Sequence, residues 1–199
     1  PCTSHRGCGV TASGERLLCR RSDGACVPAL TAGCDAILGG AALDADEPIV
    51  AALFTSRAPI HAPTHRAMVA AASLALADVT GAGGIPIAGR SHPIALLVCD
   101  DGAGHAKDRL AETVTHVVET GGVRILIGGG SVDGALDLAA VAAPRDTFVL
   151  SPSATIADFA PRGGALAAGL PALLDAPGRA RIGAAVGEHV AKGVPEMLA

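Results

Sequence analysis

Short, uniformly apolar runs alternate with longer amphipathic segments from Ile49 onward. The apolar runs have the length of strands, and we expect strands at residues 49–54, 94–99, 123–127 and 147–150. In the longer segments apolar residues recur at intervals of three and four, so we expect helices at residues 66–79, 105–120 and 132–143. Strands without polar alternation are buried on both faces. The pattern therefore predicts an α/β fold, a parallel sheet with helices on both faces.

The carboxyl ends of the expected strands lead into loops rich in small, hydroxyl-bearing and acidic residues. In a parallel sheet such loops lie side by side along one edge, where these folds bind their ligands. The four loops are residues 55–65, 100–105, 128–133 and 151–155. The sequence therefore predicts a ligand-binding edge made by these loops.

Residues 1–35 show no helical or strand period and carry five of the six cysteines. So short a segment buries too little surface to fold without cross-links, and dense cysteines indicate disulfides and an oxidising compartment. Zinc is the competing interpretation. The gaps of five, ten, six and seven residues differ from the close pairs that zinc sites prefer. The spacing resembles that of small cysteine-rich modules of exported bacterial proteins. We expect a disulfide module at 1–35, a linker at 36–48 and a lobe at 49–169.

Parity suggests how the cysteines pair. Five cysteines in the module leave one over, and one further cysteine ends the second expected strand. We therefore expect two interleaved bridges inside the module and one tether to the lobe, although spacing alone does not fix the connectivity. The hypothesis is Cys2 with Cys19, Cys8 with Cys26, and Cys34 with Cys99.

The composition narrows the functional classes. Half of the 199 residues are apolar, which suffices for one hydrophobic core and a small appendage. The 15 Lys and Arg stand against 19 Asp and Glu without any basic run, so we expect no nucleic-acid partner. No apolar run approaches the roughly 20 residues of a membrane span. Trp and Tyr are absent, so the lobe lacks large stacking platforms, and aliphatic amino acids, small amides and carboxylates are the favoured ligands.

Five short motifs follow one another in an order and spacing seen in a known class of receptors. They are ADVTGAGGI at 77–85, GR at 89–90, LVCDD at 97–101, GVRILIG at 122–128 and SPSAT at 151–155. Together they resemble the leucine/isoleucine/valine-binding family of ABC transporter receptors, which are type I periplasmic binding proteins. The resemblance covers about 110 residues of the chain.

The resemblance implies a periplasmic or extracellular solute receptor, compatible with export by a signal peptide and with a lipoprotein anchor. It implies a small-molecule ligand, an ABC permease as partner of the intact receptor, no cofactor, no metal and no enzymatic activity. In the family, hydroxyls and backbone N–H groups after the third and fourth strands hold the ligand's carboxylate, as helix N-termini favour anions. The candidate ligand-binding residues are Thr55, Ser56, Asp100, Ser131, Val132, Ser153, Ala154 and Thr155.

Two loops depart from the family pattern. The family has Gly-Pro-x-x-Ser after the third strand, whereas here Ser131 comes one residue early and Val132 takes the serine position. The first loop carries Thr55-Ser56-Arg57 and two histidines in place of Pro-x-(Ser/Thr)-Gly.

The C-terminal segment resembles the beginning of a second lobe, which in the family closes over the ligand. Residues 170–175 resemble the crossover strand and residues 179–192 the first helix of that lobe. We therefore expect an incomplete receptor, with 170–199 as crossover and truncated start of the second lobe. Apolar residues there without a covering sheet favour self-association, docking back onto the lobe, or disorder.

Other functions stay open at this point. Gly129-Gly130-Ser131-Val132-Asp133 is close to the nucleophile elbow G-x-S-x-G, and His189 follows in hydrolase order, so an α/β serine hydrolase using Ser131 is the main alternative. A plain interaction protein, with the cysteine module as its functional part, is another. Asp100 and Asp101 suit a helix cap better than an acid/base pair. Pro63 argues against a helix that joins His61 to His65, so these histidines are expected in a solvated loop.

Overall fold

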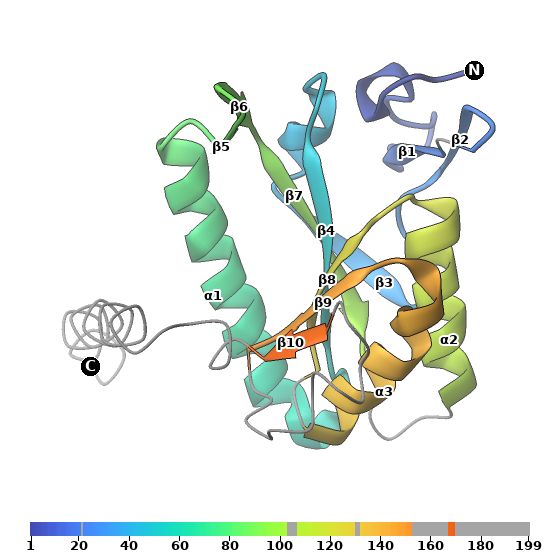
Figure 1. Cartoon of the computed structure of the whole chain (residues 1–199), viewed down its shortest axis with the longest axis vertical. Coiled ribbons are helices and arrows are strands. Elements are labelled where there is room, and N and C mark those ends of the chain that lie inside the picture. The colour runs from blue at the N-terminus through green and yellow to red at the C-terminus, as the bar shows by residue number, and fades with distance from the viewer. Residues whose placement is uncertain (21, 103–106, 130–131, 153–166, 170–199) are drawn as a thin grey trace.

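A six-stranded sheet forms the centre of the molecule (Figure 1). The structure, a computed structural model, describes residues 1–20, 22–102, 107–129, 132–152 and 167–169. The strand order is β10-β9-β8-β4-β7-β3, and every neighbouring pair is parallel except β3 with β7. The strands are β3 (Cys34–Leu38), β4 (Ile49–Thr55), β7 (Ile94–Asp100), β8 (Ile125–Gly128), β9 (Phe148–Ser151) and β10 (Ala167–Gly169).

The antiparallel edge strand β3 corrects one expectation. The linker predicted over residues 36–48 is wrong in its first part, because Ile37 and Leu38 pair with Leu97 and Leu96 of β7. After β3 the chain forms a 3-10 helix, η2 (Gly40–Asp44), whose Leu43 is buried. The apolar stretch in β3 is too short to show a period, which is why the sequence pattern missed it.

Helices cover both faces of the sheet, as predicted. α1 (Ala62–Gly81) lies on one face, and α2 (Lys107–Thr115) and α3 (Val132–Ala142) lie together on the other (Figure 1). Beyond α2 the chain winds into a π-helical turn, His116–Thr120, which keeps Val117 and Val118 buried.

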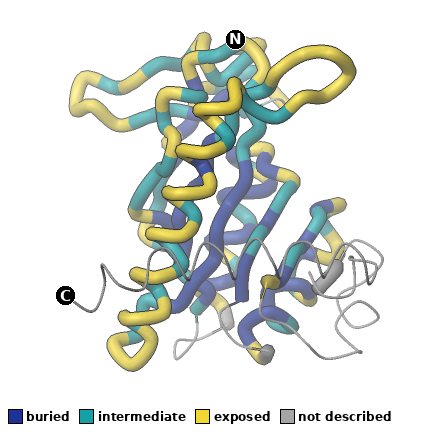
Figure 2. Tube along the Cα trace, turned by 90° about the vertical axis from the view of Figure 1, so that its left-hand side faces the viewer, coloured by how far each residue is buried: buried dark blue, intermediate teal, exposed yellow. Residues whose placement is uncertain are grey.

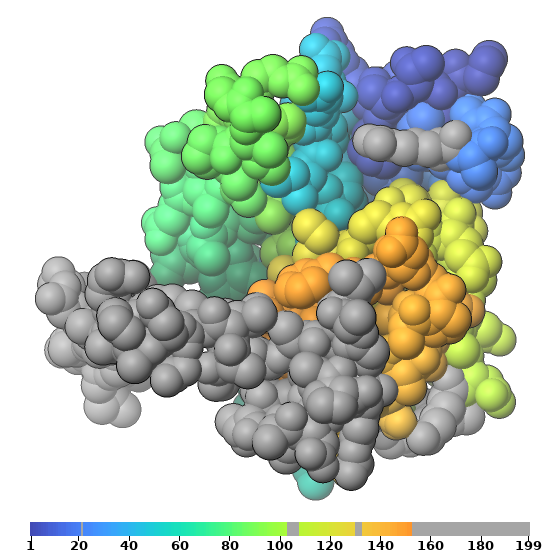
Figure 3. All heavy atoms as spheres, viewed as in Figure 1, coloured from blue at the N-terminus to red at the C-terminus, as the bar shows by residue number. Residues whose placement is uncertain are grey.

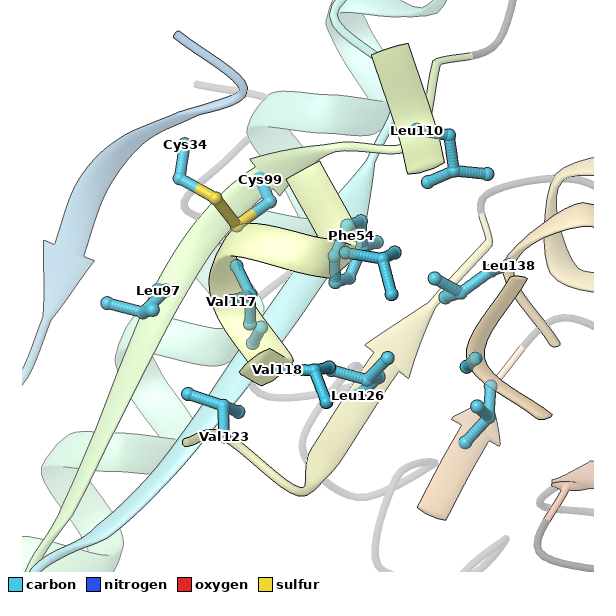
Figure 4. Close-up of a cluster of buried hydrophobic side chains, with 14 of the residues drawn as sticks. Cys34, Phe54, Leu97, Cys99, Leu110, Val117, Val118, Val123, Leu126 and Leu138 are labelled. Carbon is cyan, nitrogen blue, oxygen red and sulfur yellow. A yellow bond between two sulfur atoms is a disulfide. The ribbon is translucent and has the colours of Figure 1, made fainter. Parts of the chain in front are cut away.

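The two faces bury very different amounts of apolar surface. On the side of α2 and α3, a large cluster joins Phe54, Leu97 and Leu126 of the strands to Leu110 and Leu138 of the helices (Figure 4). On the side of α1, the described residues form a smaller buried cluster of Ala51, Leu76 and Leu96, with partly buried residues such as Ile94 and Ile127 packed against it. Much of the outer side of α1 is exposed, whereas the central strands are buried (Figure 2). The hydrophobic core therefore lies mainly under α2 and α3.

Helix α1 begins earlier than its sequence predicts. Pro63 occupies one of the first two positions of the helix, where the missing N–H has no intrahelical partner to lose. The expectation that Pro63 excludes a helix between His61 and His65 is therefore wrong. His65 lies inside α1, half-buried, and His61 is exposed in the short 3-10 helix η3 (Pro59–His61).

Two small hairpins lie outside the main sheet. β5 (Ile85–Ile87) and β6 (Arg90–His92) form one of them, joined by Ala88 and Gly89, which both have positive φ as a type I′ turn requires. β1 (Leu17–Arg20) and β2 (Ala25–Pro28) form the other, inside the cysteine-rich module, where no strand was expected. A 3-10 helix, η1 (His5–Gly7), precedes this hairpin, and another, η5 (Ala143–Arg145), follows α3.

The module packs directly on the lobe. Leu18, Val27 and Ala29 belong to the same hydrophobic cluster as Val117 and Val118. In Figure 3 the blue atoms of the module lie against the yellow atoms of the α2 region. A bidentate ion pair from Arg16 to Asp44 of η2 adds a polar link, with Nη2 donating to Oδ2 at 2.8 Å. The module thus shares the core of the lobe and is not an independent domain.

Among the described helices, none is long and apolar enough to cross a membrane. The strand and helix expected at residues 170–175 and 179–192 lie outside the described residues.

Candidate functional site

The carboxyl ends of β4, β7 and β8 meet at one edge of the sheet, as the sequence predicts. The parallel register places Thr55 opposite Asp100 and Phe54 opposite Gly128. At this edge the backbone is also linked between strands, because the Asp101 N–H donates to the Thr55 carbonyl at 3.3 Å. The loops after these three strands therefore form one continuous edge.

Thr55 and Ser56 are buried behind this edge. Thr55 is 1% exposed and its hydroxyl donates to the sulfur of Met68 in α1, at 3.4 Å. Ser56 is 4% exposed, and its hydroxyl oxygen accepts the N–H of Ala58 at 3.3 Å. Both hydroxyls are therefore used by the chain itself, to dock α1 and to shape the turn after β4.

Asp100 connects two of the loops. Its Oδ1 accepts the backbone N–H of Arg57, in the loop after β4, and that of Gly102, in its own loop, both at 3.2 Å. The other oxygen lies 3.8 Å from Nε of Arg57. The carboxylate side chain is only 16% exposed. Asp100 therefore holds the first and second loops together at the edge.

Arg57 reaches from the same edge to residues 32–35, a segment that we call the strap. Its Nη1 donates to Oδ2 of Asp35 at 3.0 Å. Its Nη2 donates to the carbonyl oxygens of Gly33, at 2.7 Å, and Ala32, at 3.3 Å. In the sequence, Arg57 stands out only as a departure from the family loop. The partners of Arg57 lie more than twenty residues earlier in the chain, and no local pattern of the sequence points to them.

Glycines let the loop after β8 approach β4. Gly128 and Gly129 have φ of 144° and 80°. A Cβ on Gly128 would come within 2.0 Å of the Phe54 carbonyl oxygen, and one on Gly129 within 2.4 Å of Cα of Ala135. The Gly129 N–H donates to the Phe54 carbonyl at 3.3 Å. Only glycine fits this close backbone approach.

The other candidate ligand residues are placed by the structure only in part. Val132 is the first residue of α3, and its side chain lies outside the described part of the chain. Ser131, Ser153, Ala154 and Thr155 also lie outside the described residues. The structure thus brings together Thr55 and Ser56, at the end of β4, with Asp100, the last residue of β7.

The cysteines are joined in the same pairs as in the parity hypothesis. The three disulfides are Cys2–Cys19, Cys8–Cys26 and Cys34–Cys99. The sulfur atoms of Cys2, Cys8 and Cys26 all lie within 4.8 Å of one another, close enough to suggest a metal site. All three are bonded in disulfides, however, and supply no thiolate to a metal.

Comparison with known proteins places the lobe in a family. Residues 48–172 match the periplasmic binding protein family. One similar solved structure is the branched-chain amino acid transporter substrate binding protein LivJ from Streptococcus pneumoniae, in complex with isoleucine. It is 19% identical with a TM-score of 0.48, over 62% of this chain and 33% of LivJ. Another is a solute binding protein of an ABC transporter from Rhodopseudomonas palustris, in complex with 3,4-dihydroxybenzoic acid. It is 18% identical with a TM-score of 0.49, over 61% of this chain and 31% of that protein.

The chain spans about a third of the length of these solved structures. No curated protein matches it. The family match extends over more than half of the chain and includes the whole of β4, β7, β8 and β9. The chain therefore belongs to the periplasmic binding protein family.

Proposed function

We propose that residues 49–169 form a ligand-binding lobe of an extracytoplasmic solute receptor of an ABC-type uptake system. The lobe binds a small amino acid, amide or carboxylate at the carboxyl edge of its sheet. The observation that carries this proposal is the register of the three central strands, which brings the loops after β4, β7 and β8 to one edge. Parallel α/β sheets bind ligands at this edge, and family membership supports a receptor role.

The chemistry of the edge supports a small polar ligand. Asp100 holds two loops in place, and glycines at 128 and 129 let the third loop pack directly on the first. The sequence offers no Trp or Tyr on which an aromatic ring would stack, which favours aliphatic ligands. The resemblance to the leucine/isoleucine/valine-binding family assigns contacts to Ser153, Ala154 and Thr155, which follow β9 along the chain. We add Ser131, which follows β8, as a further contact.

We propose that the lobe acts by binding alone and is not an enzyme. A receptor role needs donors and acceptors that hold a ligand, whereas a hydrolase needs an activated serine with a base in contact. Labelling of Ser131 by a fluorophosphonate would contradict this proposal and favour the hydrolase alternative.

A chemical-shift titration of the full chain tests the ligand proposal. L-Leucine and propionate are added separately, each up to tens of millimolar, because a single lobe contributes few buried contacts and we expect a dissociation constant of about 1 mM. Shifts are expected at residues 100–102, 128–133 and 151–156, and they should weaken in Thr155→Val.

The matched control is Thr120→Val, a half-buried threonine in the π-helical turn at the opposite end of the lobe. This variant should titrate like the unchanged protein. Shifts confined to the cysteine module, or shifts that Thr155→Val leaves unchanged, would overturn the proposed site.

A further inference from the structure

The last residues of the cysteine-rich module reach the candidate ligand edge. The strap, residues 32–35, leaves the module and passes the carboxyl end of β7, where Cys34 lies opposite Cys99. Asp35 and the carbonyl oxygens of Ala32 and Gly33 face the guanidinium of Arg57 there. This end of the lobe is therefore built from two parts of the chain that are far apart in sequence.

We propose that Arg57 is a positioning residue of the ligand edge. Held by the strap, it fixes Asp100 and the turn after β4 in the arrangement that a ligand meets. This inference rests on the proposed function, and it makes the strap of the module a structural part of the binding site.

The strap itself is held on three sides. The disulfide Cys34–Cys99 ties it to the end of β7. The Asp100 N–H donates to the Gly33 carbonyl at 2.8 Å, so this oxygen accepts from both Asp100 and Arg57. On the remaining side, a Cβ on Gly33 would come within 1.9 Å of the hydroxyl oxygen of Thr113 in α2, so the backbone lies directly on that helix. A strap fixed in this way offers Arg57 acceptors at constant positions.

Arg57 transmits this fixed geometry to the edge through both its side chain and its backbone. The planar guanidinium donates in two directions to the strap, a geometry that the single ammonium group of a lysine does not reproduce. The Arg57 N–H donates to Oδ1 of Asp100, and Nε of Arg57 faces the other oxygen at 3.8 Å. The side chain is 26% exposed, so these interactions are only partly screened by solvent. Loss of the guanidinium should therefore loosen Asp100 and the turn after β4 together.

A matched arginine elsewhere in the lobe provides the control. Arg145 is 22% exposed, and its Nε donates to Glu119 at 3.0 Å. It also donates to the Val141 carbonyl and to the hydroxyl of Thr115, at 3.0 Å for the latter. Arg145 thus joins two helices in the way that Arg57 joins two loops, but it lies away from the carboxyl edge. Arg145→Gln should remove a similar set of hydrogen bonds and an ion pair, but should leave the carboxyl edge of the sheet unchanged.

The first test measures amide hydrogen exchange of the full chain without ligand. In Arg57→Gln we expect about tenfold faster exchange or more at residues 57, 58, 101 and 102, whose N–H groups form hydrogen bonds within or between the two loops at this edge. Arg57→Lys keeps the positive charge and should show nearly the same acceleration, because an ammonium group cannot donate in two directions to the strap as the planar guanidinium does. Rescue by lysine would mean that charge alone is needed and would overturn the positioning role. Arg145→Gln should leave these amides within twofold of the unchanged protein.

Asp35→Asn is a milder variant that keeps the experiment decisive if Arg57→Gln fails to fold. Asp35 is 52% exposed, and its removal leaves both carbonyl acceptors of the strap in place. We expect about threefold acceleration at the same amides. Exchange within experimental error of the unchanged protein in both Asp35→Asn and Arg57→Lys would overturn the proposal.

The second test is the L-leucine titration of the same variants. Arg57→Gln and Arg57→Lys should weaken binding about tenfold, and Arg145→Gln less than twofold. If the unchanged protein does not bind L-leucine or propionate at the edge, the proposed function fails, while the exchange data still decide whether Arg57 positions the edge. If binding occurs and the Arg57 variants bind equally well, the inference fails and the proposed function stands.

Discussion

The cysteine-rich module and the sheet lobe keep their folds by different means. In the lobe, side chains such as Phe54, Leu97 and Leu126 are fully buried between the sheet and two helices. In the module, the buried side chains of Leu18 and Val27 pack toward the lobe, and two disulfides join its remaining segments. The module therefore packs its apolar side chains into the core of the lobe and is further held by covalent links, whereas the lobe is held by a core of its own.

The largest expected effect is on the lobe core. Phe54→Ala removes a fully buried ring from the cluster that also contains Leu126 and Leu138, and should lower the free energy of unfolding by roughly 3–5 kcal/mol. Urea denaturation followed by circular dichroism measures this loss. Leu74→Ala, on the exposed side of α1, should change it by less than about 0.5 kcal/mol. A small effect of Phe54→Ala would show that this cluster does not carry the stability of the lobe.

A smaller effect is expected when the module loses one of its disulfides. Cys8→Ala with Cys26→Ala opens a loop with a sequence separation of 18 and should destabilise the module by about 3 kcal/mol. We expect faster proteolysis within residues 1–30 and an almost unchanged urea midpoint of the lobe helices. If that midpoint falls as far as in Phe54→Ala, the lobe depends on the module, and the comparison between the two regions is wrong.

Leu18→Ala tests the packing of the module on the core of the lobe. Leu18 is fully buried against the lobe, where a Cβ on Gly121 would come within 3.2 Å of its Cδ1. We expect a loss of about 2 kcal/mol, the low end for leucine, because the site lies at a boundary that relaxes easily. Amide exchange in β1 and β2 should accelerate. Val10→Ala, which is 55% exposed in the same module, is the control and should leave that exchange unchanged.

The smallest expected effect is electrostatic. In the β1–β2 hairpin, the hydrogen bonds from the Arg20 guanidinium to Asp23, with a further one from the Ala25 N–H, lower the pKa of the Asp23 carboxyl to about 2. Because this folded-state pKa lies below the unfolded value near 3.9, the carboxylate stabilises the hairpin above about pH 4. That contribution is lost as the pH falls from about 4 to about 2. NMR titration of Asp23 measures the pKa, which should rise in Arg20→Gln and stay low in Arg6→Gln.

The periodic part of the fold was predictable from the sequence. Strands β4, β7, β8 and β9 are uniformly apolar, so their existence and parallel arrangement follow from the pattern. β3 is not predictable from the pattern because its few apolar residues show no period. The helix α1 begins earlier than the pattern indicates because Pro63 lies in its first turn, a position that tolerates proline. The hairpin of the module depends on disulfides and on packing against residues 116–121, in and after the π-helical turn, and neither leaves a periodic signal.

The edge of the sheet was also predictable, but the partners of its side chains were not. Register alone places Thr55 beside Asp100. The sequence does not show that Thr55 and Ser56 turn their hydroxyls inward, because this depends on where Met68 and Ala58 lie in space. The partner of Arg57 lies more than twenty residues away in a segment predicted to be a coreless module, so no local pattern reveals it.

The disulfide between Cys34 and Cys99 turns residues 34–99 into a closed covalent ring. That ring contains β3, β4, α1 and the β5–β6 hairpin, which offers an exposed cleavage site for trypsin after Arg90. A single cut there opens the ring without separating the chain, so the nicked protein should remain one covalent species on a non-reducing gel and give two fragments only after reduction. The N-terminal module and the β4 strand would thus stay bound to the rest of the lobe after damage that severs an ordinary loop.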